Sequence, residues 1–174
     1  MSRSSKKIYL GELNDTPLGD LRLAASDSGL LAVEWAESLP ELEKYLQRFH
    51  RPMELNSKKL KAYASELLDY LAGSREKFRF KIDWQTLRPF QRQAMQAVYA
   101  IPYGETRTYA EIATRIGRPR AYRAVGRANA TNPMPLVIPC HRVIGSDGKL
   151  HGYGGGQGLQ TKEWLLKMEG AILN

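Results

Sequence analysis

The chain is organised around Pro139-Cys140-His141-Arg142-Val143, which places its only cysteine next to a histidine. A thiol reacts as the thiolate and has an ordinary pKa of about 8.5, so a base or cation within reach raises its reactive fraction. His141 or Arg142 could supply that activation if the backbone turns at Pro139, because adjacent side chains on a regular strand point to opposite faces. Alone, the pair leaves two interpretations open: a nucleophile, or a buried cysteine that only packs.

Composition limits what this thiol can do. The chain is 43% hydrophobic, as in a soluble globular protein, and no apolar run approaches the roughly 20 residues of a membrane span. The basic N-terminus lacks a following apolar segment, so we expect a cytoplasmic protein with no membrane partner. A single cysteine excludes an intramolecular disulfide and a multi-cysteine zinc site. The histidines lack ligand spacing, so we expect no metal and no cofactor.

Positive charge is concentrated in the second half of the chain. Residues 1–84 hold 14 Lys and Arg against 13 Asp and Glu, whereas residues 85–174 hold 12 against 5. This asymmetry favours a polyanionic partner for the second half. A charge that serves only solubility is the alternative.

The first half predicts a small α+β domain, residues 1–84, with no evident chemistry. Alternating apolar residues predict three short strands, at residues 8–13, 21–26 and 30–36. Turn signals separate these strands, so we expect an antiparallel sheet in which they form a meander. Phe78, Phe80 and Ile82 alternate in the same way and predict a further strand.

Two amphipathic helices are expected between these strands. Ser38 and Glu41 have the spacing of a capping box at the start of the first helix. The second helix begins near Ser57 and ends at Gly73. Its apolar residues are expected to face inward: Leu60, Tyr63, Leu67, Leu68 and Leu71.

The second half predicts a mainly helical domain, residues 85–174, that contains a winged helix-turn-helix. Pro89 suits the first turn of an opening helix. Thr108 caps the next helix, and Gly117-Arg118-Pro119 forms the turn that leads to another. Small apolar residues such as Ala124 let that last helix pack closely on the domain.

A basic face marks the last helix of this motif. Arg120, Arg123 and Arg127 recur at i, i+3 and i+7. This pattern is typical of a helix-turn-helix whose arginines meet phosphates or bases. Arginine could also fill the space of a displaced base, because its planar guanidinium stacks. A solvated arginine face on an ordinary helix is the alternative.

The segments around the cysteine are rich in turn residues. Asn132-Pro133-Met134-Pro135 leads into Leu136-Val137-Ile138, which we predict as a short buried strand or extended segment that delivers Cys140. Residues 145–158 contain seven glycines, which permit a backbone to approach a ligand closely, although a disordered surface loop is the alternative.

A final helix is expected after this glycine-rich stretch. Thr161 is predicted to cap it, with Trp164, Leu165 and Met168 facing inward and Glu169 in its last turn.

The combined pattern N-P-x-P-x-x-I-P-C-H-R-V, with R-A-V-G upstream and K-E-W-L-L-x-x-E-G downstream, resembles the O6-alkylguanine-DNA alkyltransferases. The resemblance is strongest over residues 85–174 and argues against an inert cysteine. It implies direct-reversal repair, in which the cysteine takes the alkyl group from O6-alkylguanine in double-stranded DNA and keeps it. Each molecule then acts once, and O4-methylthymine is a weaker expected substrate.

The resemblance also implies roles for the residues around the thiol. Cys140 is the acceptor, His141 acts through a bridging water as its base, and Glu169 orients His141. Tyr109 assists the departure of the guanine. Asn132 braces the turn that carries the nucleophile.

On the DNA side, Arg123 is implied as the finger that stands in for the flipped nucleotide, with the protein in the minor groove. The other residues expected at the DNA are Arg120, Arg127, Thr108 and Ala124. The substrate pocket is expected to contain Tyr153, Gly154, Val143 and Pro135. We expect a monomer in solution that can assemble cooperatively on DNA.

Two departures from the family pattern limit this transfer. Relatives often have serine or alanine after the tyrosine of the active-site loop, whereas Gly154 follows Tyr153 here and removes a possible hydroxyl. The run Gln157-Gly158-Leu159-Gln160 also makes this loop longer than in some relatives. Apart from these departures, the zinc site of some relatives has no ligands in this sequence.

Three other functions compete with alkyl transfer. A non-transferring alkyltransferase-like protein would bind lesions, but such proteins typically replace the cysteine. A transcriptional regulator of the same fold would be expected to carry a further module. A thiol hydrolase would turn over many times.

Overall fold

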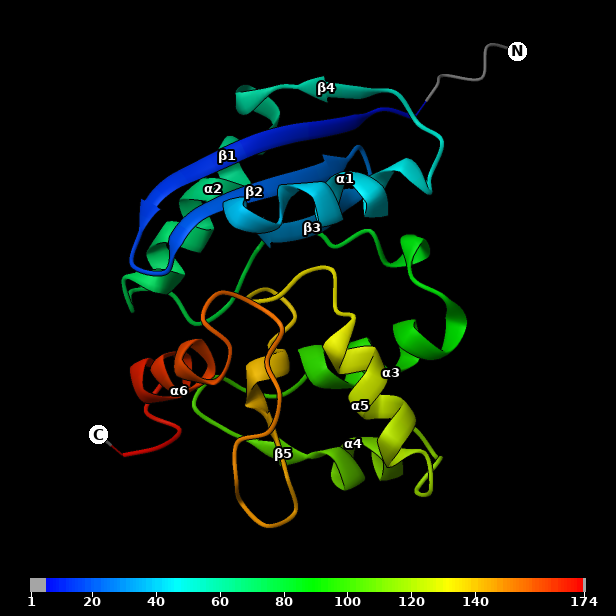
Figure 1. The fold of residues 1–174 in the computed structure, drawn as a ribbon, viewed down its shortest axis with the longest axis vertical. Coiled ribbons are helices and arrows are strands. Elements are labelled where there is room, and N and C mark those ends of the chain that lie inside the picture. The colour runs from blue at the N-terminus through cyan, green and yellow to red at the C-terminus, as the bar shows by residue number, and fades with distance from the viewer. Residues whose placement is uncertain (1–5, 174) are drawn as a thin grey trace. The chain divides into compact units, whose positions relative to one another are not determined.

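The computed structural model describes residues 6–173, which divide between Asp83 and Trp84 into two compact units (Figure 1). The predicted α+β class is confirmed, because the first unit is built on a sheet and the second is mainly helical. None of the helices in this part of the chain has the length and apolar character that a membrane span needs.

The first unit contains a four-stranded sheet with the order β3-β2-β1-β4. Its strands are β1 (Ile8–Thr16), β2 (Gly19–Ser26), β3 (Gly29–Trp35) and β4 (Met53–Leu55). β1, β2 and β3 form the expected antiparallel meander. β4, which the sequence did not predict, pairs with β1 in parallel. Three residues are too few to display an alternating pattern, which explains the omission.

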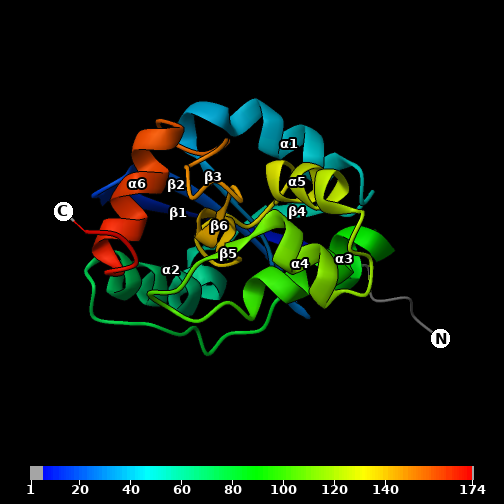
Figure 2. The same ribbon diagram turned by 90° about the horizontal axis from the view of Figure 1, so that it is seen from below.

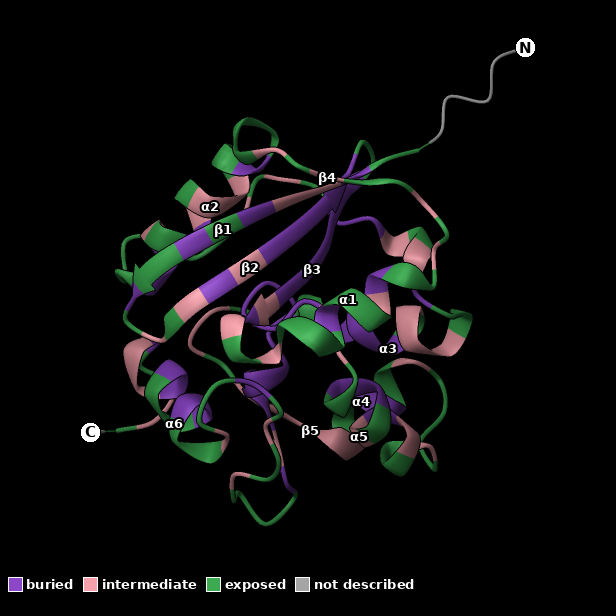
Figure 3. Ribbon diagram, turned by 45° about the horizontal axis from the view of Figure 1, so that its top comes forward, coloured by how far each residue is buried: buried purple, intermediate pink, exposed green. Residues whose placement is uncertain are grey.

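Two helices, α1 (Leu39–Gln47) and α2 (Ser57–Leu71), pack on opposite faces of this sheet (Figure 2). β3 is buried at every position but one, as the colouring of Figure 3 shows. Gly11 of β1 lies under α2, where an added Cβ would stand 2.7 Å from the Cβ of Leu60. Glycine at this position therefore lets the helix approach the sheet closely.

Two predictions for this unit were wrong. Leu68 was expected to face inward but is 42% exposed, because Tyr70 occupies the buried side of α2 instead. The strand predicted around Phe78 and Phe80 does not form, and Ile82 makes only an isolated bridge. Phe78 packs on Tyr70, with ring centroids 5.5 Å apart, so these aromatic residues cover α2 rather than pair with the sheet.

The second unit is built from helices joined by short strands. Its elements are α3 (Pro89–Tyr99), β5 (Arg107–Thr108), α4 (Tyr109–Arg115), α5 (Tyr122–Ala130), β6 (Val143–Ile144) and α6 (Leu159–Met168). α4 and α5 form the predicted helix-turn-helix, and β5 pairs with β6 in parallel. Arg120 lies in the turn before α5, so the basic helix face contains only Arg123 and Arg127.

Two local predictions for this unit also need correction. Residues 136–138 are buried as expected, but they form turns instead of a strand, and Leu136 has a φ of 73°. Thr161 is not the cap of α6, because the helix begins earlier, at Leu159. This earlier start sets a different inward face, which contains Lys162 and leaves Trp164 36% exposed.

A capping box was predicted at Ser38 and a simple cap at Thr108, and only the second forms, as a full capping box. The hydroxyl of Thr108 accepts the N–H of Glu111 at 3.1 Å, and the Glu111 carboxylate accepts the N–H of Thr108 at 2.6 Å. Ser38 makes no such bond, because it ends a 3₁₀ turn and has a ψ of 27° instead of an extended backbone. Pro40, near the start of α1, also lacks the N–H that a cap would accept.

These two sites make a matched test of cap stability. We expect Thr108→Ala to lower the free energy of unfolding by about 1 kcal/mol, because the backbone N–H of Glu111 loses its acceptor. Ser38→Ala should change it very little. Denaturant unfolding of both variants measures the difference, and equal losses would contradict the assignment.

Candidate active site

Cys140 begins a 3₁₀ turn, Cys140–Arg142, that follows Pro139. The backbone therefore turns at the point where a nucleophile and an adjacent base require it. The thiol is buried, with 5% of the residue exposed. Because a buried turn leaves backbone groups without their usual partners, side chains must satisfy them.

Two asparagines hold this turn in place. The amide nitrogen of Asn132 donates to the carbonyl of Ile138 at 2.9 Å, and its oxygen accepts the N–H of Met134 at 2.9 Å. The amide nitrogen of Asn129, on α5, donates to the carbonyl of Cys140 at 3.1 Å. The nucleophile is thus fixed to the helix-turn-helix through its own backbone.

His141 and Glu169 form a fully buried pair. The distance from His141 Nε2 to Glu169 Oε1 is 2.8 Å, and both side chains are 0% exposed. Arg142 donates to both oxygens of the same carboxylate at 2.8 Å and also binds the carbonyl of Ile101 at 2.7 Å. A bidentate arginine compensates the buried carboxylate and fixes its orientation.

The protonation states follow from this pairing. Burial alone would raise the pKa of Glu169, but the hydrogen bonds from His141 and Arg142 outweigh it and lower that pKa to about 2. An ionised carboxylate only accepts, so the proton of a neutral His141 lies on Nε2 and its Nδ1 is the unprotonated nitrogen. Burial lowers the pKa of His141, although Glu169 opposes this. His141 therefore rests in the neutral form, which can act as a base.

The thiol needs such a base. Burial raises the pKa of Cys140, while a hydrogen bond from Asn132 and the charge of Lys162 act in the opposite direction. Most of the thiol therefore carries its proton at neutral pH, and its reaction depends on proton removal.

A cavity of about 330 Å³ opens next to the thiol. It is lined by residues of α4, α5, the nucleophile turn and the glycine-rich loop: Tyr109, Gly126, Asn129, Ala130, Cys140, Gly152, Tyr153 and Gly154. The predicted pocket residues Tyr153 and Gly154 are among them. Val143 and Pro135 are not, because both are buried elsewhere in the unit. The glycines leave backbone exposed to a flat ligand.

Tyr109 stands at the edge of this cavity as a protonated phenol. Its hydroxyl donates to the carbonyl of His151 at 3.5 Å. Burial raises the pKa of Tyr109, and the charge of Cys140 adds to this effect. The phenol therefore keeps its proton at neutral pH and can donate it to a ligand.

The residues expected at the DNA lie along α5 and just before it. Arg120, Arg123 and Arg127 are exposed, and Ala124 is half-buried. α5 thus presents arginines to solvent while its Gly126 and Ala130 form a wall of the cavity. Thr108 is engaged in its cap.

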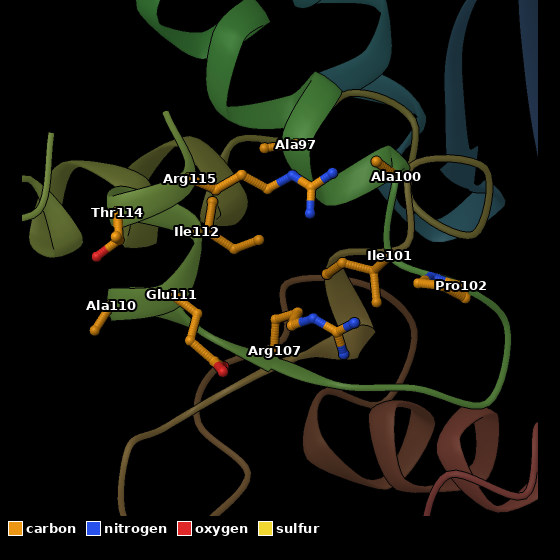
Figure 4. A pocket seen from close by; sticks show the side chains of 10 residues that line it. All are labelled: Ala97, Ala100, Ile101, Pro102, Arg107, Ala110, Glu111, Ile112, Thr114 and Arg115. Carbon is orange, nitrogen blue, oxygen red and sulfur yellow. The ribbon is translucent and has the colours of Figure 1, made fainter. Parts of the chain in front are cut away.

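A second hollow of the same unit lies between α3 and α4 and has a volume of about 590 Å³. Figure 4 shows Arg107 and Arg115 extending along opposite sides of it. It shares no residue with the cavity at Cys140, and the described residues that line it include no cysteine or histidine. No group of three or more potential metal ligands gathers among residues 6–173.

Sequence reasoning missed two residues of the site. Lys162 is 0% exposed, although lysine is rarely buried, and Asn129 contacts the nucleophile turn. Arg142 was considered only as an activating cation, whereas it binds Glu169. For Lys162, the only signal was its place at the start of the K-E-W-L-L pattern.

A buried thiol with a histidine–carboxylate pair, in a cavity walled by a helix-turn-helix, defines a DNA-binding protein with a nucleophilic cysteine. Family models agree with this class. Residues 89–171 match the DNA binding domain of 6-O-methylguanine DNA methyltransferase, and residues 8–84 match its ribonuclease-like domain.

Individual relatives are similar over nearly the whole chain. The methylated-DNA–protein-cysteine methyltransferase of Methanosarcina barkeri is 43% identical over 158 residues, which cover 91% of this chain and 95% of that protein. The protein of the same name from Salmonella typhimurium is 40% identical over 162 residues, 91% of this chain and 94% of its own.

Solved structures are also similar over nearly the whole chain. The Mycobacterium tuberculosis O6-methylguanine methyltransferase matches with a TM-score of 0.76 at 37% identity, covering 96% of this chain and 95% of that one. Mycobacterium tuberculosis OGT in complex with DNA matches with a TM-score of 0.75 at 38% identity, covering 95% and 93%. The chain belongs to the 6-O-methylguanine DNA methyltransferase family, and the resemblance inferred from the sequence is confirmed. The predicted enzyme class agrees with the names of these relatives.

The buried carboxylate can be tested through the reactivity of the thiol. In Glu169→Gln the amide oxygen still accepts the imidazole N–H, but the charge that raises the pKa of His141 is gone. We expect His141 to become a weaker base and the alkylation of Cys140 by iodoacetamide near neutral pH to slow on the order of tenfold, as one pKa unit would produce.

The matched control is Glu163→Gln, which removes an exposed carboxylate from the same helix. Its rate of alkylation should equal that of the unmodified chain. An unchanged pH–rate profile in Glu169→Gln would remove Glu169 from the network.

Proposed function

We propose that this chain repairs DNA by taking the alkyl group of O6-alkylguanine onto Cys140 in a single irreversible transfer. The buried thiol, placed in a cavity beside the His141–Glu169 pair, is the observation that carries the proposal. Residues 85–174 act as the DNA-binding and alkyl-acceptor domain. Residues 1–84 form a separate α/β domain that contributes no reacting group.

The first step is removal of the thiol proton. Nδ1 of neutral His141 takes this proton through a bridging water, and the Glu169 carboxylate stabilises the resulting imidazolium. The low pKa of Glu169, about 2, keeps it ionised throughout. Its two bonds from Arg142 hold it in place while the charge on the imidazole changes.

The second step transfers the alkyl group. The thiolate sulfur attacks the alkyl carbon, a C–S bond forms, and the bond between that carbon and O6 breaks. Its electron pair passes to the guanine, which thereby gains negative charge. Tyr109 stabilises this charge by donating a proton or hydrogen bond to the base. Three glycines in the lining of the cavity, Gly126, Gly152 and Gly154, leave room for a planar base.

The product explains why each molecule acts once. A thioether has no leaving group that His141 and a water could displace, unlike the thioester of a cysteine hydrolase. Cys140 therefore stays alkylated, and the reaction is stoichiometric.

Access to the lesion requires that the nucleotide leaves the duplex. A base inside the stack cannot reach a thiol that is 5% exposed, so the base must flip into the cavity. Arg123 is exposed on α5, the helix that also walls the cavity, and fills the vacated space from the minor groove. O4-methylthymine enters the same cavity less well. The chain works as a cytoplasmic monomer that can assemble cooperatively on DNA.

Substitution of Arg123 distinguishes base flipping from the alkyl-transfer step. We expect Arg123→Ala to slow repair of duplex DNA at least tenfold, because flipping loses the side chain that compensates unstacking. Reaction of free benzylguanine with Cys140 should stay nearly unchanged, since no base has to leave a duplex.

Arg48→Ala is the control for net charge, because it removes an exposed arginine just after the end of α1, in the first unit. It should leave both reactions as they are. Equal losses on duplex and free base in Arg123→Ala would contradict the flipping role.

The decisive experiment is intact mass after incubation with duplex DNA that contains one O6-methylguanine. We expect a single added methyl group that saturates at one per protein and maps to Cys140, and no adduct in Cys140→Ala. Tight lesion binding without an adduct would instead indicate an alkyltransferase-like protein. Repeated turnover on an ester or peptide would indicate a hydrolase.

A further inference from the structure

Lys162 is a buried cation in the middle of the site. It lies on α6, is 0% exposed, and donates from Nζ to the carbonyls of Val143 and His151, each at 2.7 Å. Both of these partners are neutral oxygens rather than carboxylates. Burying an ammonium group costs free energy. We therefore expect Lys162 to have a function at the site that offsets this cost.

The two carbonyls belong to the two segments that make the cavity. Val143 directly follows the Cys140–Arg142 turn, and His151 directly precedes the loop residues Gly152 to Gly154. Through these two hydrogen bonds, the ammonium group of Lys162 connects the segment of the nucleophile to the loop that receives the base. The His151 carbonyl also accepts from the Tyr109 hydroxyl at 3.5 Å, so the same tie reaches the phenol.

Lys162 also supplies a positive charge near the thiol that the neighbouring groups do not supply. Glu169 is compensated by the bidentate Arg142, and neutral His141 adds no charge. Burial lowers the pKa of Lys162 to about 8, and the charge of Cys140 opposes this shift. Lys162 is therefore largely protonated at neutral pH, and it favours the thiolate in return.

We propose that Lys162 is a positioning residue of the alkyl transfer, whose ammonium group locks the loop against the segment of the nucleophile and favours the Cys140 thiolate. This inference rests on the proposed function, in which that thiolate attacks the alkyl group. A lysine that served only to hold the fold would alter stability but leave the titration of the thiol unchanged.

The titration of Cys140 tests whether the charge of Lys162 favours the thiolate. The rate of alkylation by iodoacetamide is followed across neutral and alkaline pH in the full chain, in Lys162→Met, in Lys162→Arg and in Lys167→Met. We expect Lys162→Met to move the midpoint to higher pH and to slow the reaction near neutral pH on the order of tenfold, the effect of one pKa unit. At pH values where the thiol is fully ionised, the rate should converge with that of the unmodified chain.

The other two variants separate charge from shape. Lys162→Arg keeps the positive charge, so its midpoint should stay closer to that of the unmodified chain than the midpoint of Lys162→Met does. Lys167→Met removes an exposed lysine that pairs with Glu163 on the same helix, and it should have no effect. An unmoved midpoint in folded Lys162→Met would overturn the proposal.

A measurement without substitution keeps the test valid if the variant fails to fold. Coupling between two charges is reciprocal, so a negative charge placed on Cys140 must raise the pKa of Lys162. We expect NMR of ¹³C-labelled lysine to show a higher Lys162 pKa when iodoacetate has put a charged carboxymethyl group on Cys140 than when iodoacetamide has put a neutral group of the same size there. Identical Lys162 titrations in the two adducts would overturn the coupling.

Neither measurement uses DNA, so the two proposals fail separately. A shifted thiol titration without methyl transfer from DNA would refute the proposed function and leave the role of Lys162 in thiol activation. Methyl transfer with an unmoved midpoint would refute the role of Lys162 alone.

Discussion

The second unit depends on one buried carboxylate. Glu169 receives His141 on one oxygen and Arg142 on both, with no side-chain exposure of its own. A charge in such a place is tolerated only when every partner is present, because an unpaired ion there would cost several kcal/mol. The end of α6 is therefore bound to the Cys140–Arg142 turn, and the His141–Glu169 pair forms part of the core.

Burial has two opposing effects on the thiol of Cys140. Burial shields Cys140 from solvent but raises its pKa, which weakens it as a nucleophile. The hydrogen bond from Asn132 and the charge of Lys162 act against this rise of the pKa. In the proposed mechanism, His141 recovers further reactivity by taking the thiol proton.

Sequence patterns predicted the regular elements well where they were long. The meander, α2, α3 and the cap at Thr108 all have local causes, namely alternation, apolar periodicity and a side chain that accepts a nearby N–H. The failures depended on distant contacts. Ser38 lost its cap to a preceding 3₁₀ turn, and Phe78 packs on a helix instead of pairing in a sheet. At the site, residue types suggested Cys140 and His141, but the burial of Lys162 follows only from the way α6 packs.

The bond from Asn129 to the Cys140 carbonyl has a consequence for engineering. The same helix carries Arg123 on its outer side and holds the backbone of the nucleophile on its inner side. Transplanting Pro139 to Val143 into another scaffold would carry over the thiol and its histidine without the anchor that sets their register. A graft that keeps the native register of Cys140 would therefore have to include α5, so the nucleophile turn and this helix form one transplantable unit.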